Sequence, residues 1–291
     1  MPHAQLESFE FVSDVDGPHL LVLGAIHGDE HCGPQAITQI IKEFESGQRT
    51  IKKGKVTFIP VCNPRAYAQG VRFIDHNLNR NIKRREDTRG IYEYELMNAL
   101  CPYLESADIM LDIHSYQVGG KPFAFVNSLE GQEVEISRAI GAEYIVTGNV
   151  EAYRNTRSVE DKMSVGTQEY VLTFGGEGII FECGQHEDPK SLINAKQAIE
   201  KILAFLGLCE GVHDSGRNVP VITLKKTFMK KGEGHLSKDW SNFDRLKQGD
   251  VIAQFDDGSE LICPEDGVFV LPKANVTVGY EFGYLGQAVG E

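Results

Sequence analysis

The sequence predicts an α/β protein with a mixed, mostly parallel central sheet flanked by helices, followed by a small C-terminal all-β domain. Up to about residue 208, apolar runs of strand length alternate with segments of helical spacing, which is typical of a parallel sheet covered by helices. Beyond residue 220, helical spacing disappears, and short strand candidates alternate with turn signals. We therefore expect one domain over residues 1–210 and a second over residues 218–291.

The composition argues against several classes of function. The chain has 291 residues and a formal net charge of -13, which disfavours nucleic acid or an anionic membrane as the main partner. Its first residues lack the pattern of a signal peptide, and no apolar run approaches the length of a membrane span. We therefore expect a cytoplasmic location. The six cysteines are scattered without a C-x-x-C pair, so we expect free, mostly buried thiols. The oligomeric state stays open, and a homo-oligomer is one option.

The elements of the first domain can be assigned in order. Residues 20–26 form a near-continuous apolar run, as expected of a strand that is covered on both faces. Further strands are expected over residues 8–13, 55–61, 108–113, 123–126, 143–150 and 179–182. Helices are expected over residues 34–46, 91–104, 133–140 and 189–206, with Pro34 and Pro189 at first helical positions.

Two other segments are informative. Residues 66–90 are polar and lack regular apolar spacing, and a long polar loop in a compact domain is usually functional or disordered. Residues 209–220 have the composition of a linker. The second domain then has strand candidates over residues 221–227, 251–255, 260–263, 268–271 and 276–278.

Two histidines follow apolar strands directly. His27 comes after the strand at 20–26, and His114 comes after the strand at 108–113. Because ligands bind at the carboxyl edge of an open α/β sheet, we expect both side chains at that edge. Glu30 lies three residues after His27, which completes the two-histidine, one-carboxylate set of a catalytic zinc site. Either histidine taken alone has the simpler interpretation of a hydrogen-bonded loop residue.

Residues 27–31 also match H-x-x-E-H, the inverted zincin pattern, in which both histidines lie on one helix. A helix here is disfavoured because Gly28 lies inside the motif, a strand precedes it, and Pro34 follows. We therefore expect His31 to be a neighbour of the site and not a ligand.

Hydrolysis at zinc also needs a general base. Glu182 is the candidate because it ends the strand at 179–182 and should lie at the same edge, although a solvated strand-end Glu is the simpler local interpretation. Arg65 and Arg80, with Asn79 beside the latter, could bind a substrate carboxylate or stabilise an oxyanion. As isolated residues, arginines are more often surface charges.

Taken together, the motifs HGDE, NPRA, HNLNR, DIH and FECGQ, spread in this order over residues 20–190, resemble the succinylglutamate desuccinylase/aspartoacylase family. This family is a branch of the zinc carboxypeptidase-like fold. The resemblance implies that His27, Glu30 and His114 bind one zinc ion per chain. It also implies that Glu182 is the base that activates the zinc water and that Arg65 helps to polarise the scissile carbonyl.

The same resemblance suggests residues for the substrate carboxylate, namely Asn79, Arg80, Tyr153 and Arg157. Asp112 is a candidate for orienting a ligand histidine, with an ordinary sheet-edge hydrogen bond as the alternative. One departure concerns residue 77, which is Asn where the family usually has Asp. The substrate specificity of the family therefore transfers to this chain less well than its zinc chemistry does.

The C-terminal domain resembles a biotinyl/lipoyl-type β-sandwich. Lys273 is not expected to carry a cofactor because it lacks the hydrophobic neighbours of an attachment site. We expect this domain to pack beside the catalytic mouth and to restrict it to small substrates.

The predicted function is that of a cytoplasmic zinc-dependent amidohydrolase that cleaves a small anionic N-acyl amino acid. A zinc carboxypeptidase acting on peptides is the nearest alternative. A metal-binding relative without catalytic activity is the alternative from a different class.

Overall fold

The computed structural model describes residues 5–148, 152, 165–213 and 217–289. Its helices are α1 (Cys32–Glu45), α2 (Pro64–Gln69), α3 (Tyr92–Ser106), α4 (Gln132–Ile140), α6 (Thr167–Thr173) and α7 (Pro189–Phe205). The strands before residue 210 are β1 (Phe9–Val12), β2 (His19–Gly24), β3 (Lys55–Ile59), β4 (Ile109–Tyr116), β5 (Phe123–Phe125), β6 (Tyr144–Thr147) and β7 (Glu177–Gln185). The later strands are β8 (Val221–Met229), β9 (Gly234–Leu236), β10 (Asp244–Leu246), β11 (Val251–Phe255), β12 (Glu260–Ile262), β13 (Gly267–Val270) and β14 (Glu281–Ala288).

Most of these strands belong to one large mixed sheet. Within the described residues, its order is β1-β3-β2-β4-β7-β5-β6-β8-β14-β13-β10, and a smaller sheet has the order β12-β11-β9. Strands β3, β2, β4 and β7 run parallel to one another, and so do β5, β6 and β8. The pairs β1–β3 and β5–β7 are antiparallel. The part of the sheet formed before residue 221 is therefore mixed and mostly parallel, as the sequence predicts.

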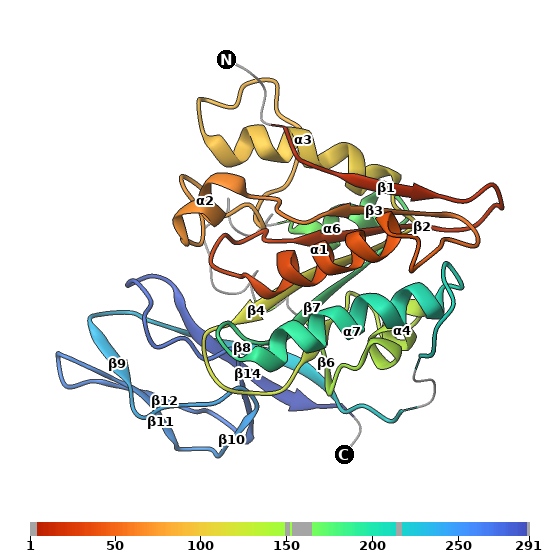
Figure 1. The fold of residues 1–291 in the computed structure, drawn as a ribbon. Helices are drawn as coiled ribbons and strands as arrows, with labels where there is room; N and C mark the ends of the chain where they lie inside the picture. The colour runs from red at the N-terminus through yellow and green to blue at the C-terminus, as the bar shows by residue number, and fades with distance from the viewer. Residues whose placement is uncertain (1–4, 149–151, 153–164, 214–216, 290–291) are drawn as a thin grey trace.

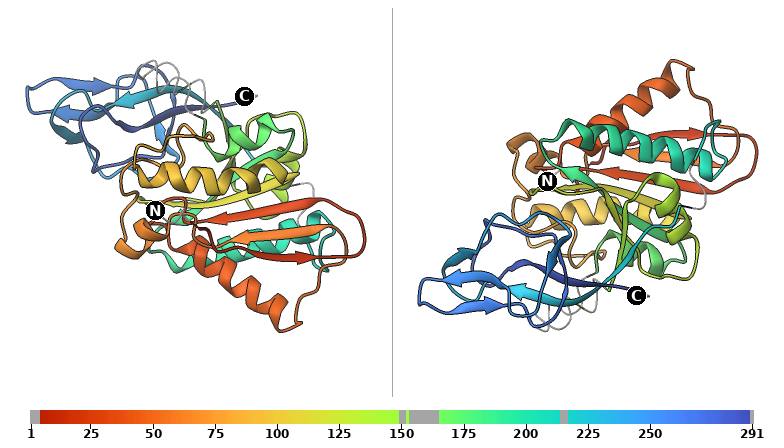
Figure 2. Two further views of the ribbon diagram at one scale, coloured as in Figure 1. Left: turned by 90° about the horizontal axis from the view of Figure 1, so that it is seen from above. Right: turned by 90° about the horizontal axis from the view of Figure 1, so that it is seen from below.

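Helices cover both faces of the parallel region (Figures 1 and 2). One apolar core lies between the sheet and helices α1, α4 and α7, and a second lies between the sheet and helices α3 and α6. Strand β2 contributes Leu20 and Val22 to the first core and Leu21 and Leu23 to the second. Because both faces of this strand are buried, its apolar run has no polar alternation.

Helix α1 begins earlier than expected. The sequence predicts a start at Pro34, but the helix begins at Cys32, directly after the turn that contains Glu30. Helix α7 begins at Pro189, as predicted. Asp188 accepts a hydrogen bond from the backbone N–H of Lys190 and caps the helix. The early start of α1 shortens the connection between the strand and the helix at the suspected site.

The C-terminal strands are not separate from the first sheet. Strand β8 pairs in parallel with β6, so the large sheet continues through β8 into β14, β13 and β10. A shared core joins the two parts, with Phe123 and Val146 from the first and Ile222 and Tyr284 from the second. Figure 1 shows the C-terminal strands at one side of the helical layers.

One expected C-terminal strand is irregular in the structure, and a long strand that was not expected is present. Residues 276–278, expected as a strand, are irregular. Strand β14, which the sequence pattern did not reveal, spans eight residues and contains Gly283 and Gly286. A Cβ at Gly286 would lie 2.4 Å from Ile222 Cγ2 on the neighbouring strand, so close packing requires glycine here. Glycine lowers the local strand signal, and pairing on both sides of β14 outweighs it.

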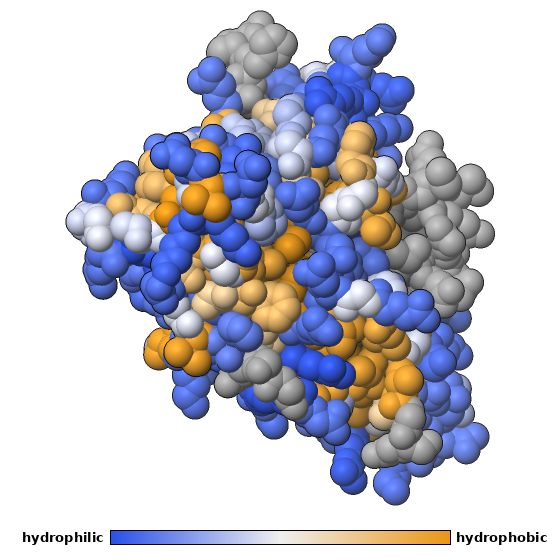
Figure 3. Space-filling view, turned by 90° about the vertical axis from the view of Figure 1, so that its right-hand side faces the viewer, coloured by the Kyte–Doolittle hydropathy of each residue, from blue (hydrophilic) through white to orange (hydrophobic). Residues whose placement is uncertain are grey.

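The described part of the chain contains no helix with the length and apolarity needed to cross a membrane. Figure 3 shows one face of the molecule, on which hydrophilic residues surround separate apolar patches. Exposed large apolar side chains include Val12 on β1, Leu172 on α6 and Ile193 on α7. Since α6 and α7 cover opposite faces of the sheet, these side chains do not belong to one surface.

Candidate active site

The turn after β2 positions His27 and Glu30. It packs tightly against α2, since a Cβ at Gly28 would lie 2.2 Å from the carbonyl carbon of Ala66. Glycine at this position therefore permits the close backbone approach that places the turn. His27 and Glu30 are 3% and 2% exposed, so the turn delivers both side chains into the protein interior.

Strands β4 and β7 bring His114 and Glu182 to the same edge of the sheet. The two residues are direct neighbours in the parallel register of these strands. The turn after β2 lies beside them because β2 is the other neighbour of β4. Adjacent parallel strands thus place residues from three distant parts of the sequence at one carboxyl edge.

The ligand candidates converge on the carboxylate of Glu30. Its Oε1 lies 2.8 Å from His27 Nδ1, and its Oε2 lies 2.9 Å from His114 Nδ1. One donor atom from each residue lies within 4.8 Å of the others, and all three residues are buried. Zinc lies roughly 2.0–2.1 Å from the histidine nitrogens that bind it, so the ligand atoms of one site must lie close to one another, as they do here. These three residues therefore fit a metal ion, whereas His31 is outside the group and contacts the Tyr67 ring.

The other ring nitrogen of each histidine faces an oxygen atom. His27 Nε2 lies 3.1 Å from Asn77 Oδ1, and His114 Nε2 lies 3.0 Å from Asp112 Oδ2. Such partners orient metal-binding histidines by holding the proton on the nitrogen that is not a ligand. The arrangement therefore leaves both Nδ1 atoms turned toward the metal position. It also gives Asn77 a role at His27, although the sequence indicated only that it departs from the family pattern.

The pKa values of the two histidines shift in opposite directions. Burial, together with the positive charge of Arg72, lowers the pKa of His27 to about 3, which favours the neutral imidazole that binds metals. Burial also opposes the charged form of His114, but Asp112 and Glu30 raise its pKa well above the ordinary range. The two histidines in turn hold the pKa of the Glu30 carboxyl well below its ordinary value, against the effect of burial.

Glu182 has the properties expected of a proton-transfer residue. It is 8% exposed, and its Oε2 has no hydrogen-bond partner among the described residues. Burial raises the pKa of Glu182 to about 8, although the charge on His114 opposes this change. A carboxyl group with a pKa near neutrality can accept and return a proton near pH 7.

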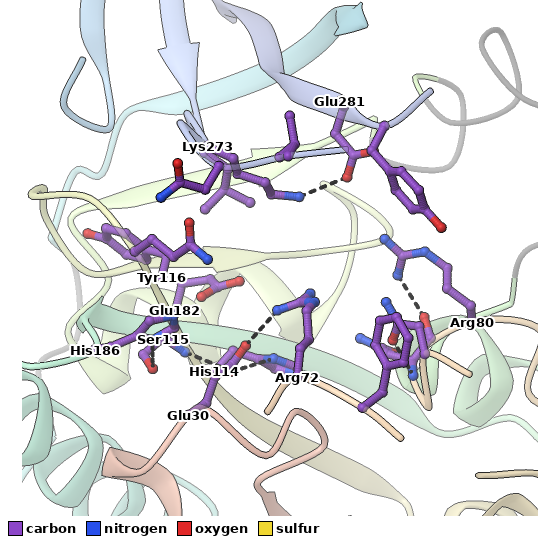
Figure 4. Close-up of a pocket in the computed structure, with 18 of the residues that line it drawn as sticks. Glu30, Arg72, Arg80, His114, Ser115, Tyr116, Glu182, His186, Lys273 and Glu281 are labelled. Atoms are coloured by element: carbon purple, nitrogen blue, oxygen red, sulfur yellow. Dashed lines mark hydrogen bonds and ion pairs between the residues drawn. The ribbon is translucent and has the colours of Figure 1, made fainter. Parts of the chain in front are cut away.

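The site lies at a cavity of about 750 Å³. Its lining includes Glu30, His114 and Glu182 from the first sheet region, and residues between 271 and 281 from the C-terminal part. Figure 4 shows Lys273 and Glu281 on one wall, facing Arg72, His114 and Glu182. Lys273 Nζ and Glu281 Oε1 form an ion pair of 2.8 Å. The C-terminal strands and loops thus supply one wall of the site.

Among the described residues, Arg72 is an arginine that contacts the ligand group, and no sequence motif singled it out. Its Nη1 lies 3.2 Å from Glu30 Oε1, and the residue lines the cavity. Arg65 is exposed, and its guanidinium lies 4.5 Å from the centre of the Tyr92 ring. It is not among the described residues that line the cavity. The only sequence signal for Arg72 was its position in the polar loop that also contains Arg80.

The other predicted substrate residues fall into two groups. Asn79 and Arg80 line the cavity, but Asn79 Oδ1 accepts a hydrogen bond from the backbone N–H of Thr167. Arg80 Nη1 donates to the backbone carbonyl of Asn79. Tyr153 and Arg157 lie outside the described residues.

Two buried cysteines lie close to each other near the site residues in sequence. Cys32 Sγ and Cys183 Sγ are 2.7 Å apart and buried, and each follows a site residue closely in sequence. All six cysteines are free thiols, as expected.

A buried carboxylate organises the polar loop of the cavity. Glu93, on α3, is fully buried and accepts hydrogen bonds from the backbone N–H groups of Ile74, Asp75 and His76 at 2.7, 3.0 and 3.0 Å. It also accepts one from Asn63 Nδ2 at 3.1 Å. One side chain thus connects the loop to the segment that begins α2. No local sequence pattern indicated this role.

Replacing Glu93 with Gln is expected to destabilise the protein by about 2–4 kcal/mol. An amide keeps one acceptor oxygen but turns an NH₂ group toward backbone donors that then lack partners. Urea unfolding would measure the change, with Glu95→Gln on the same helix as the control. If both variants unfold at the parent's urea midpoint, the loop does not depend on Glu93.

Comparison with known proteins finds a matching family model and relatives that are named as deacylases. The model of the succinylglutamate desuccinylase/aspartoacylase catalytic domain matches residues 16–206. N-alpha-acetyl-L-2,4-diaminobutyric acid deacetylase of Halomonas elongata is 29% identical over 216 residues, which cover 67% of this chain and 57% of that protein. Succinylglutamate desuccinylase of Pseudomonas aeruginosa is 22% identical over 290 residues, which cover 93% of this chain and 84% of that protein.

Solved structures have the same fold. A succinylglutamate desuccinylase/aspartoacylase from Rhodobacter sphaeroides superposes with a TM-score of 0.75 at 19% identity, covering 94% of this chain and 87% of that one. The product-bound ectoine utilization protein EutE from Ruegeria pomeroyi has a TM-score of 0.75 at 18% identity, covering 99% of this chain and 97% of that one. The likeness extends through the C-terminal strands.

Proposed function

Since the chain belongs to the succinylglutamate desuccinylase/aspartoacylase family, we propose that it is a zinc-dependent amidohydrolase that cleaves a small anionic N-acyl amino acid. The observation that best supports this proposal is the convergence of His27, Glu30 and His114 beside the buried Glu182. Relatives named as a deacetylase and a desuccinylase support removal of an acyl group.

In this proposal, His27, Glu30 and His114 hold one zinc ion per chain. A zinc ion bound there would act as a Lewis acid toward the scissile carbonyl and lower the pKa of a water molecule. The oxygen partners of the two histidines, Asn77 and Asp112, keep the ligand nitrogens directed at the ion.

Glu182 is the proposed general base and acid. Its Oε2 takes a proton from the water molecule that attacks the amide carbon. The same carboxyl then gives that proton to the leaving nitrogen as the carbon–nitrogen bond breaks. Both steps are compatible with the buried position of Glu182 and with its raised pKa.

Arg72 is proposed to stabilise the oxyanion that forms on the carbonyl oxygen, because it lies beside Glu30 and lines the cavity. Arg80, with its planar guanidinium, is proposed to bind the substrate carboxylate. Arg65, expected from the sequence for the oxyanion, would have to leave the Tyr92 ring to reach the cavity.

Replacing Arg72 with Met is expected to lower kcat by about 10²–10³-fold, as for the loss of one oxyanion donor. Arg65→Met is the matched comparison, because it removes the same group from a position on the Tyr92 ring. Zinc content should be measured in both variants, since Arg72 also contacts Glu30. A larger loss for Arg65→Met than for Arg72→Met would instead support the assignment based on the sequence.

The cavity supports a small substrate. Its volume of about 750 Å³ lies within the usual range for small-molecule sites, and the C-terminal segment closes one wall. The test is hydrolysis of N-acetyl and N-succinyl amino acids by the zinc-loaded protein, with short peptides as the comparison. Activity on peptides alone would favour the carboxypeptidase alternative, and no activity on either class would favour a relative that only binds metal.

A further inference from the structure

A network of polar residues, most of them buried, connects the two ligand histidines. Thr167, the first residue of α6, joins its two halves. Its Oγ1 donates a 2.7 Å hydrogen bond to Asp112 Oδ2, the atom that lies 3.0 Å from His114 Nε2. Its backbone N–H donates a 2.8 Å hydrogen bond to Asn79 Oδ1.

The second half of the network leads to His27. The backbone N–H of Asn79 donates a 2.9 Å hydrogen bond to Asn77 Oδ1. This oxygen atom also lies 3.1 Å from His27 Nε2. The partner oxygen of each ligand histidine is therefore held, directly or through Asn79, by Thr167.

We propose that Thr167 is a positioning residue for the metal centre. Its hydroxyl sets the orientation of His114 through Asp112, whereas its backbone N–H supports His27 through Asn79 and Asn77. This inference rests on the proposed zinc-dependent function. It adds a residue that no motif of the sequence indicated.

The surroundings of Asp112 make this hydrogen bond important. Asp112 and Thr167 are both completely buried, and Asp112 Oδ1 has no hydrogen-bond partner among the described residues. The hydroxyl of Thr167 is therefore a main constraint on the rotation of the carboxylate. If the carboxylate turns, His114 Nε2 loses the oxygen atom that orients its ring.

The start of α6 is itself fixed to the sheet. Gln168 Nε2 donates to the backbone carbonyls of Phe125 and Gly178 at 2.9 and 2.7 Å. The Glu169 carboxylate accepts a 2.7 Å hydrogen bond from the backbone N–H of Gly166. Thr167 lies between these anchored residues, so its hydroxyl has a defined position from which to hold Asp112.

The test compares zinc affinity of the full-length protein and its variants by competition with a chromophoric chelator. Thr167→Val removes the hydroxyl at nearly constant volume. Its zinc affinity is expected to fall, by at most the roughly 10–100-fold that the loss of a direct partner of a metal ligand causes. Thr167→Ser, which keeps the hydroxyl, should bind zinc nearly as the parent does. Thr173→Val is the control, because that exposed hydroxyl donates only to the Tyr170 carbonyl of the same helix.

Thermal unfolding without metal shows whether each variant is folded, and Thr167→Ala replaces the Val variant if the latter is not. Saturating zinc should restore kcat in the weakened variant, which a general loss of structure would not allow. Equal zinc affinity of the parent and of the folded variant that lacks the hydroxyl would overturn the role of Thr167 alone. A parent that binds no zinc would overturn the proposed function as well. A parent that binds zinc but hydrolyses no N-acyl amino acid would overturn only the proposed function.

Discussion

Replacing Glu182 with Gln is expected to lower kcat by about 10²–10⁴-fold, the usual contribution of a general acid–base residue. The amide has nearly the same shape as the carboxyl but cannot take a proton from water. Glu182 is outside the group of three ligand candidates, so zinc binding should be retained. Steady-state kinetics together with zinc content measured on the same sample would separate the two properties.

The matched control is Glu187→Gln, which changes an exposed carboxylate in the segment that follows β7. Its kcat should stay close to that of the parent. Normal turnover by the Glu182 variant would show that another group transfers the proton. Loss of zinc from that variant would indicate a role in the metal site instead.

Replacing Glu30 with Gln is expected to weaken zinc binding more than roughly 100-fold. This is more than the loss of a residue that only hydrogen-bonds to a metal ligand causes. Both carboxylate oxygens face histidine nitrogens, and Oε2 also accepts a hydrogen bond from the backbone N–H of Ser115. An amide removes the negative charge and turns an NH₂ group toward one of these donors. Activity should be lost together with the metal.

Removal of zinc from the parent protein provides the second measurement. A ligand present at 1,000 times its dissociation constant stabilises the folded state by about 4 kcal/mol, so chelation should lower the melting temperature of the parent. The Glu30→Gln variant should show little further change on chelation. Asp29→Asn is the control, because it alters a carboxylate in the same turn that is outside the ligand group. If the Glu30 variant binds zinc as tightly as the Asp29 control, the ion is held elsewhere.

Some features of the site follow from short stretches of sequence. His27 and His114 each come directly after an apolar strand, and Glu182 ends another. Because neighbouring parallel strands end at one edge of a sheet, these local patterns are enough to bring distant residues together. The structure has the three strands β2, β4 and β7 as neighbours in this order.

The arginines could not be assigned in this way. Arg65 follows a strand and a turn, but the short helix α2 places its guanidinium on the Tyr92 ring. Arg72 lies in an irregular loop, whose course depends on hydrogen bonds to Glu93 from another helix. Such contacts between distant residues leave no periodic pattern in the sequence.

The sequence alone determined the class of the fold and the group of histidine and carboxylate residues, because both depend on the order of buried strands and on the residues at their ends. Tertiary structure decided the partners of these residues. Asn77, Asp112 and Thr167 acquire their roles only when loop, strand and helix meet beside the histidines. The continuation of the sheet through β8 and β14 was also decided there, because backbone pairing depends on which edges come together and only weakly on side-chain pattern.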